Sequence, residues 1–256
     1  MGDGVRTEVI GGVGVCRIDQ PDTRNALSPV LLAAVIDGLE ELDGDPTVRC
    51  IVLAGTDEVF ATGADARSLA AGTPEADANQ GQADFWSRLS AVGAPVVAGV
   101  SGWALGTGCE LALACDLIVA SKTTRFGQPE VTLGLIPGGG ATQRLTRALG
   151  KQRAMELILT GRRMGAEQAH SYGLVNVVAD RKKWFEATMS LATQISERAP
   201  VATRLAKRAI LAADRENLDE GLTTERRLLA DAMATEDHVE GVKAFLEGRP
   251  PRFEGH

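Results

Sequence analysis

Hydrophobic positions along the chain fall into two alternating kinds of segment. Short runs rich in β-branched residues predict buried strands at residues 48–55, 94–102, 116–121 and 174–179. Between them, apolar residues recur with helical spacing at residues 79–91, 109–115, 140–149 and 152–159. Alternation of this kind is typical of α/β architecture with a largely parallel sheet.

The two ends of the chain have their own patterns. Residues 5–18 alternate apolar and polar positions around Gly11 and Gly12, which predicts a hairpin, and Ser28 followed by Pro29 predicts the start of a helix. From Lys182 onward strand signals give way to helical ones. We expect an α/β core over residues 1–195 and a helical region over residues 196–256. The small and polar residues 70–82 predict a mobile loop.

Composition narrows the class of protein. The chain has 256 residues, 44% of them hydrophobic, and a net charge of -7, which argues against a nucleic acid or an anionic membrane as partner. No apolar run reaches the roughly 20 residues of a membrane span, and the first residues lack a signal-peptide pattern. The four cysteines form no CxxC pair, and the three histidines show no metal-ligand spacing. We expect a cytoplasmic protein without a metal site.

Two glutamates stand out because each is an isolated carboxylate in apolar surroundings. Glu110 follows the glycine-rich turn of residues 102–108 and falls in the first turn of a predicted helix, whose free N–H groups could form an oxyanion hole. Glu130 lies 20 residues later in the stretch FGQPEVTLGLIPGGG. Desolvation would raise both pKa values and suit the pair to proton transfer near neutral pH. The alternative is two unrelated residues, with Glu110 favoured at a helix start by the dipole alone.

A third segment, residues 59–69 (VFATGADARSL), has the form of a strand that ends at a glycine and passes into a short helix. Its backbone N–H groups could complete an oxyanion hole, or it could be an ordinary connecting loop.

The sequence lacks the other common catalytic motifs. Residues 99–103 (GVSGW) lack the last glycine of a nucleophile elbow, and neither a Rossmann fingerprint nor a Walker A motif occurs.

Five motifs, in order, carry a resemblance to a known family. They are RNALS at residues 24–28, FATGAD at 60–65, PVVAGVSGWALGTGCELALACDLIVAS at 95–121, FGQPEVTLGLIPGGGATQRLTRALG at 126–150 and AFLEGRPPRF at 244–253. Together they closely resemble the crotonase superfamily, and within it the enoyl-CoA hydratases. The resemblance covers essentially the whole chain.

The resemblance implies a spiral of ββα units with a C-terminal helical region that mediates packing into a trimer or a dimer of trimers. It implies an acyl-CoA thioester substrate, no cofactor besides the coenzyme A of that substrate, and oxyanion donors on the backbone of Ala64 and Thr107. By the same resemblance Glu110 activates a water molecule and Glu130 delivers a proton to C2. Further substrate contacts map onto Arg24, Ala26, Asp65, Ala66, Arg67, Gly106, Pro129 and Gly138.

Two departures from the family pattern are visible. Thr107 occupies a position that is commonly glycine, so its side chain would narrow the pocket, and Gly248 replaces a basic residue that some relatives carry. A trans-2-enoyl-CoA hydratase is the leading interpretation, because isomerase relatives commonly keep only one acidic residue. An enoyl-CoA isomerase or another acyl-CoA-processing enzyme remains as an alternative. Outside enzymes, an acyl-CoA-binding regulatory protein is the other hypothesis.

Overall fold

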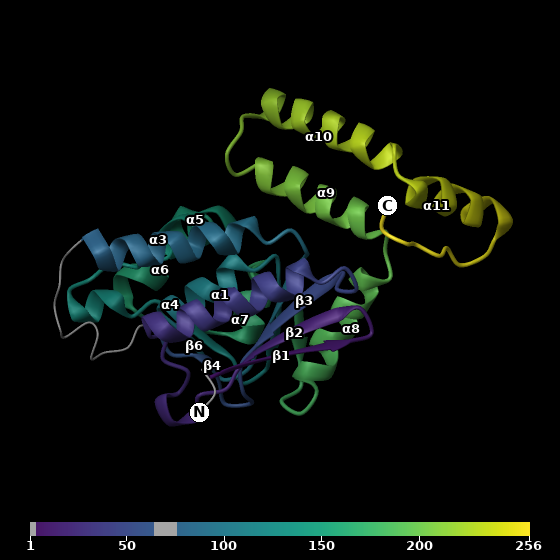
Figure 1. Cartoon of the computed structure of the whole chain (residues 1–256). Coiled ribbons are helices and arrows are strands. Elements are labelled where there is room, and N and C mark those ends of the chain that lie inside the picture. The colour runs from purple at the N-terminus through teal and green to yellow at the C-terminus, as the bar shows by residue number, and fades with distance from the viewer. Residues whose placement is uncertain (1–3, 64–75) are drawn as a thin grey trace.

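A computed structural model describes residues 4–63 and 76–256, whose strands form two sheets. Figure 1 shows helices packed around the sheets, with the C-terminal helices α9, α10 and α11 (residues 200–247) to one side of them. The larger sheet has the strand order β1-β2-β3-β5-β7-β10. Its strands are β1 (Val5–Ile10), β2 (Val13–Ile18), β3 (Cys50–Ala54), β5 (Val96–Val100), β7 (Leu117–Ser121) and β10 (Val177–Ala179). Only β1 pairs antiparallel, with β2. The predicted hairpin and the four predicted strands are confirmed.

The smaller sheet has the order β4-β6-β8-β9. It consists of β4 (Val59–Ala61), β6 (Trp103–Leu105), β8 (Arg125–Gly127) and β9 (Arg163–Gly165). The first three strands are parallel to one another, and β9 pairs antiparallel with β8. Because β4, β6 and β8 run in the same direction, the segments that leave them start from the same edge of the sheet.

Helix α1 (Pro29–Gly44) packs against one face of the larger sheet, and α8 (Trp184–Ser196) packs against the other. The further helices are α3 (Ala76–Ala91), α4 (Thr107–Ala114), α5 (Ala141–Leu149), α6 (Lys151–Thr160), α7 (Ala166–Ser171), α9 (Pro200–Ala212), α10 (Leu218–Met233) and α11 (Glu236–Glu247), with short 3-10 turns η1 (Pro21–Thr23) and η2 (Glu130–Leu133). The two-sided cover explains why β3 is apolar at every position rather than at alternate ones.

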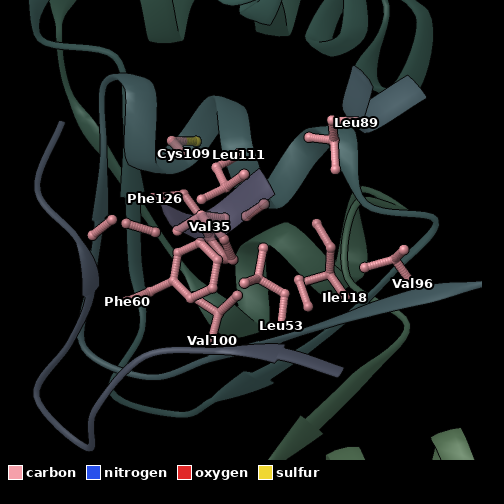
Figure 2. Close-up of a cluster of buried hydrophobic side chains, with 14 of the residues drawn as sticks. Val35, Leu53, Phe60, Leu89, Val96, Val100, Cys109, Leu111, Ile118 and Phe126 are labelled. Atoms are coloured by element: carbon pink, nitrogen blue, oxygen red, sulfur yellow. The ribbon is translucent and has the colours of Figure 1, made fainter. Parts of the chain in front are cut away.

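Strand β3 shows how the core divides. Leu53 points into a cluster that contains Phe60 of β4 and Val35 of α1. Figure 2 shows this cluster, which also includes side chains of α4 and β8. Val52, the neighbouring residue, points to the opposite face and joins a second cluster around Trp184 of α8. Alternate residues of one strand thus bury two faces of the sheet, and α4 is held against the first of them.

The turn between β2 and α1 is fixed by Asn25, which is fully buried and has a left-handed φ of 52°. Its side-chain oxygen accepts a hydrogen bond from the backbone N–H of Gln20 at 2.7 Å. Its side-chain nitrogen donates to the carbonyl oxygens of Ile18, Val59 and Phe60 at 3.2, 3.3 and 3.0 Å. One amide therefore ties the turn to strand β4, which leads into the candidate site.

The predicted loop over residues 70–82 is partly wrong. Residues 76–82 belong to α3, which begins three residues before the helix predicted over residues 79–91, while residues 70–75 lie outside the described part of the chain. Alanines and glutamines in this stretch are good helix formers, and their propensity outweighs the polar character that suggested a loop.

Helix α9 is joined to the core by two ion pairs. Arg204 contacts Asp43 at 2.6 Å and Lys207 contacts Asp116 at 2.8 Å, with the lysine side chain only 11% exposed. Beyond α9 the helices α10 and α11 extend away from the sheets (Figure 1). None of the helices within the described residues is long and apolar enough to cross a membrane.

We predict that Asn25→Ala lowers the free energy of unfolding by about 3 kcal/mol or more, because it leaves buried backbone groups without partners and places alanine at a positive φ. The urea unfolding midpoint measures this loss. Gln194→Ala, an exposed change on α8, is the matched control and should shift stability by less than about 0.5 kcal/mol. A loss as small as the control's would show that Asn25 does not anchor the turn.

Candidate active site

The candidate site lies where the segments after β4, β6 and β8 meet. Gly63 follows β4, Gly106 follows β6, and Glu130 comes shortly after β8. A Cβ built on Gly63 would lie 3.1 Å from the carbonyl oxygen of Leu105 and 3.7 Å from the backbone nitrogen of Thr107. The first two segments therefore run against each other at backbone distance.

Helix α4 opens toward this junction with an uncapped N-terminus. Its N-cap residue, Gly106, has φ 52° and ψ -129° and supplies no side-chain hydrogen bond. The N–H of Glu110 donates to the carbonyl oxygen of Gly106 at 2.9 Å and so closes the first turn. The N–H groups of the three residues before Glu110 precede the helical ladder and carry the positive end of the helix dipole.

Glu110 is 1% exposed, and its carboxylate is fixed by the start of α5. Its Oε1 accepts hydrogen bonds from the N–H of Gly139 at 2.7 Å and of Ala141 at 3.0 Å. Burial raises the pKa of Glu110, although these N–H groups and the positive charge of Arg144 act in the opposite direction. The carboxylate is thus held in one orientation and has a raised affinity for a proton.

Glu130 opens η2 and is half-buried. The pKa of Glu130 is raised to about 7, mainly by burial and to a smaller extent by the negative charge of Glu110. Its Oε1 lies 2.8 Å from the position that a Cβ on Gly106 would occupy. The structure therefore brings the two predicted glutamates together at the beginning of α4, and Gly106 leaves the space that the second carboxylate needs.

Gln128 is a residue that the sequence motifs did not single out. It is 1% exposed, and with its amide nitrogen turned toward Glu130 it donates to Oε1 at 3.1 Å and to Oε2 at 3.2 Å. No local pattern pointed to this contact, because Pro129 between the two residues has ψ 5° and Glu130 begins a 3-10 turn, so the segment is not extended. Cys109, beside the same groups, is fully buried, and burial raises the pKa of its thiol to about 12. This thiol is therefore not a nucleophile at neutral pH.

Trp86 of α3 and Arg144 of α5 close the side of the site next to Gly139. A Cβ on Gly139 would collide with the Trp86 ring and would lie 2.6 Å from Oε2 of Glu110. The Arg144 guanidinium lies 5.8 Å from the Trp86 ring centroid and donates to the carbonyl oxygen of Gly139 at 2.7 Å. Glycine is therefore required here, because the indole and the carboxylate both press against the backbone.

The other predicted contact residues are distributed around this centre. Arg24 lines a surface hollow of about 280 Å³ together with Thr62, Trp103, Leu105 and Arg163. Ala26 and Pro129 are half-buried, and Gly138 is exposed on the loop before α5. The predicted residues Ala64, Asp65, Ala66 and Arg67 lie outside the described residues. Within residues 4–63 and 76–256, no group of three or more His, Cys, Asp or Glu side chains could hold a metal ion.

The arrangement suits one kind of chemistry. A fixed buried carboxylate beside a second, more easily protonated one can take a proton from one bound group and give a proton to another. The open helix N-terminus beside them can stabilise negative charge that develops on an oxygen.

Comparison with known proteins identifies the family to which the chain belongs. Residues 8–256 match the family model described as Enoyl-CoA hydratase/isomerase. The protein named "Probable enoyl-CoA hydratase echA8" of Mycobacterium tuberculosis (strain CDC 1551 / Oshkosh) is 45% identical over 244 residues, which cover 94% of each chain. The 2,3-dehydroadipyl-CoA hydratase of Escherichia coli (strain K12) is 40% identical over 238 residues, or 93% of each chain.

Among solved structures, an enoyl-CoA hydratase subunit from Geobacillus kaustophilus HTA426 superposes with a TM-score of 0.95 at 44% identity. The match covers 99% of this chain and 98% of the other. Family model, sequence relatives and fold therefore agree over nearly the full length, and the chain belongs to the enoyl-CoA hydratase/isomerase family.

Proposed function

We propose that this chain is an enoyl-CoA hydratase, which adds water to the double bond of a trans-2-enoyl-CoA and forms a 3-hydroxyacyl-CoA. The observation that carries the proposal is the convergence of Glu110 and Glu130, both with raised pKa values, at the open N-terminus of α4. The names of the relatives support the same activity.

In the proposed reaction the thioester carbonyl oxygen accepts hydrogen bonds from the backbone N–H groups of Ala64 and Thr107. When the water oxygen forms a bond to C3, electron density moves through C2 onto the carbonyl oxygen and forms an enolate. Fixed N–H dipoles stabilise that charge without having to reorganise, and the loss of one such donor costs about 10²–10³ in rate in other enzymes. The approach of Gly63 to the nitrogen of Thr107 fits two donors that face one oxygen.

The two glutamates divide the proton transfers between them. Glu110, as the carboxylate, removes one proton from the bound water while the water oxygen forms a bond to C3. Glu130, as the acid, gives its proton to C2 and becomes the carboxylate. The product gains one OH and one H, and the proton held by Glu110 returns to Glu130 through water before the next turnover. A pKa of about 7 keeps a substantial fraction of Glu130 protonated at neutral pH.

The remaining predicted contacts belong to the coenzyme A part of the substrate. Arg24 brings a positive charge to its hollow for a phosphate group, and Asp65, Ala66 and Arg67 follow the first oxyanion donor along the chain. The backbone groups of Ala26, Gly106, Pro129 and Gly138 complete the contacts that we propose. No separate cofactor enters the reaction.

We also propose that the chain assembles as a homotrimer or a dimer of trimers through residues 196–256, while residues 1–195 form the catalytic core. The support is a set of large apolar side chains exposed on α9, α10 and α11: Ile210, Leu211, Leu218, Leu222, Leu229, Met233, Val239, Val242, Phe245 and Leu246. Exposed apolar surface of this extent marks an interaction site.

The free, mostly buried cysteines support a reducing, cytoplasmic location.

The first test is the hydration of crotonyl-CoA, followed by loss of the enoyl thioester absorbance. We predict that Glu110→Gln and Glu130→Gln each lower kcat by about 10²-fold or more, because each removes one proton-transfer group. Binding of a saturated acyl-CoA should be retained. Glu225→Gln, an exposed change on α10, is the control. Full activity of either active-site variant would place the chemistry elsewhere, and isomerisation of a 3-enoyl-CoA without hydration would favour the isomerase alternative.

The pH dependence of kcat/KM should follow the two carboxyl groups. Activity should fall as the pH rises through about 7, because Glu130 loses the proton that it must donate, and at low pH it should fall as Glu110 becomes protonated. Gln128→Leu removes a donor to the ionised form of Glu130 and should move the upper limb to higher pH. An upper limb that stays in place in this variant would contradict the hydrogen bond as a determinant of that pKa.

The assembly is tested by sedimentation velocity. We expect a mass of three or six copies of the 26.9 kDa chain. Combined Phe245→Glu and Leu246→Glu changes should shift the distribution toward smaller species, because these side chains are 85% and 78% exposed in the single chain and would be charged in an apolar interface. An unchanged mass would show that this end of α11 is not part of the interface.

A further inference from the structure

Thr107 is unusual among the threonines of this protein because its hydroxyl has no hydrogen-bond partner in the described part of the chain. Most other threonine hydroxyls donate to a nearby carbonyl oxygen, as Thr124 does to Val100 at 2.8 Å and Thr188 to Trp184 at 2.8 Å. A threonine inside a helix often bonds the carbonyl four residues earlier, but Thr107 is the first residue of α4 and has no such helical carbonyl.

The backbone N–H of Thr107 is equally uncommitted within the described residues. It precedes the first helical hydrogen bond, which runs from the N–H of Glu110 to the carbonyl oxygen of Gly106. Its nitrogen lies 3.7 Å from the position that a Cβ on Gly63 would occupy. One residue therefore offers two unfilled donors at the point where the two glycine-containing segments meet.

The two donors are close together by covalent geometry. Two of the three staggered χ1 rotamers of threonine place Oγ1 gauche to the backbone nitrogen, so that both groups can reach one acceptor on the same side of the residue. Branching at Cβ restricts χ1, and a hydroxyl held in this way loses little entropy when it binds. The residue is also half-buried, so it is not sealed inside the core.

We propose that the Thr107 hydroxyl is a further oxyanion donor, which hydrogen-bonds the same thioester oxygen as the backbone N–H group of Thr107. The inference rests on the proposed function, because it assigns the acceptor as the carbonyl oxygen of an acyl-CoA. A glycine at this position would supply only the N–H. Thr107 is thus a catalytic residue through its side chain as well as its backbone, and it strengthens enolate stabilisation in this particular chain.

The test compares three forms of the protein. Thr107→Val keeps the branched shape and the backbone N–H but removes the hydroxyl, whereas Thr107→Ser keeps the hydroxyl and removes the methyl group. We expect kcat/KM for crotonyl-CoA to fall about 10-fold or more in Thr107→Val, and Thr107→Ser to recover most of that loss. Thr193→Val is the matched control, since Thr193 is an exposed threonine of α8 whose hydroxyl also lacks a partner within the described residues.

A spectroscopic measurement separates charge stabilisation from a change in shape. Acetoacetyl-CoA forms an enolate that absorbs in the near ultraviolet, and oxyanion donors lower the pH at which the bound ligand ionises. We expect this midpoint to lie about one pH unit higher in Thr107→Val than in the wild-type protein, in step with the 10-fold rate loss. Thr107→Ser should lie close to the wild-type midpoint.

The outcomes decide between the possibilities. Normal rates and an unshifted midpoint in Thr107→Val would overturn the role of the hydroxyl while leaving the hydratase proposal intact. Equal losses in Thr107→Ser and Thr107→Val would also overturn it, since the methyl group would then be the important part. If the wild-type protein neither hydrates crotonyl-CoA nor ionises bound acetoacetyl-CoA, the proposed function and this inference fall together.

Discussion

The rest of the site depends on how one buried carboxylate, that of Glu110, is compensated. An ionised carboxylate removed from water costs several kcal/mol unless hydrogen bonds replace the lost hydration. Here the N–H groups of Gly139 and Ala141 supply those bonds at 2.7 and 3.0 Å. The contact joins the first turn of α4 to the first turn of α5, so the position of the carboxylate and the packing of two helices are fixed together.

This contact is possible only where the backbone can come very close. A side chain on Gly139 would meet the Trp86 indole and Oε2 of Glu110, and one on Gly106 would lie 2.8 Å from Oε1 of Glu130. Gly108 is equally constrained, since its Cβ would collide with the carbonyl of Ala61 at the end of β4. The glycines of the two motifs are therefore needed for their lack of a side chain rather than for flexibility. Each one lets a neighbouring strand, helix or carboxylate approach the backbone closely.

The sequence was most informative where burial imposes a simple pattern. Strand β3 could be predicted because both faces are covered and every residue is apolar, and Glu110 could be singled out because a charge in such a run is rare. The start of α3 was misjudged, since small polar residues fit a loop and a helix equally well. Gln128 and the N–H groups of Gly139 and Ala141 escaped prediction for another reason. Their importance comes from contacts across 29 or 31 residues, or from an amide orientation, which no local pattern encodes.

The two glutamates are chemically different because their surroundings differ. Glu110 accepts two backbone N–H groups and lies within the field of Arg144, and both effects stabilise its charged form against the cost of burial. Among the described residues, Glu130 has only the amide of Gln128 as a side-chain donor, and it also experiences the negative charge of Glu110. When two nearby carboxylates cannot both ionise easily, the one whose charge is better stabilised by hydrogen bonds and positive charge loses its proton first. The hydrogen bonds from the start of α5 therefore favour Glu110 as the base and leave Glu130 as the acid, so the division of labour follows from the backbone rather than from the residue type.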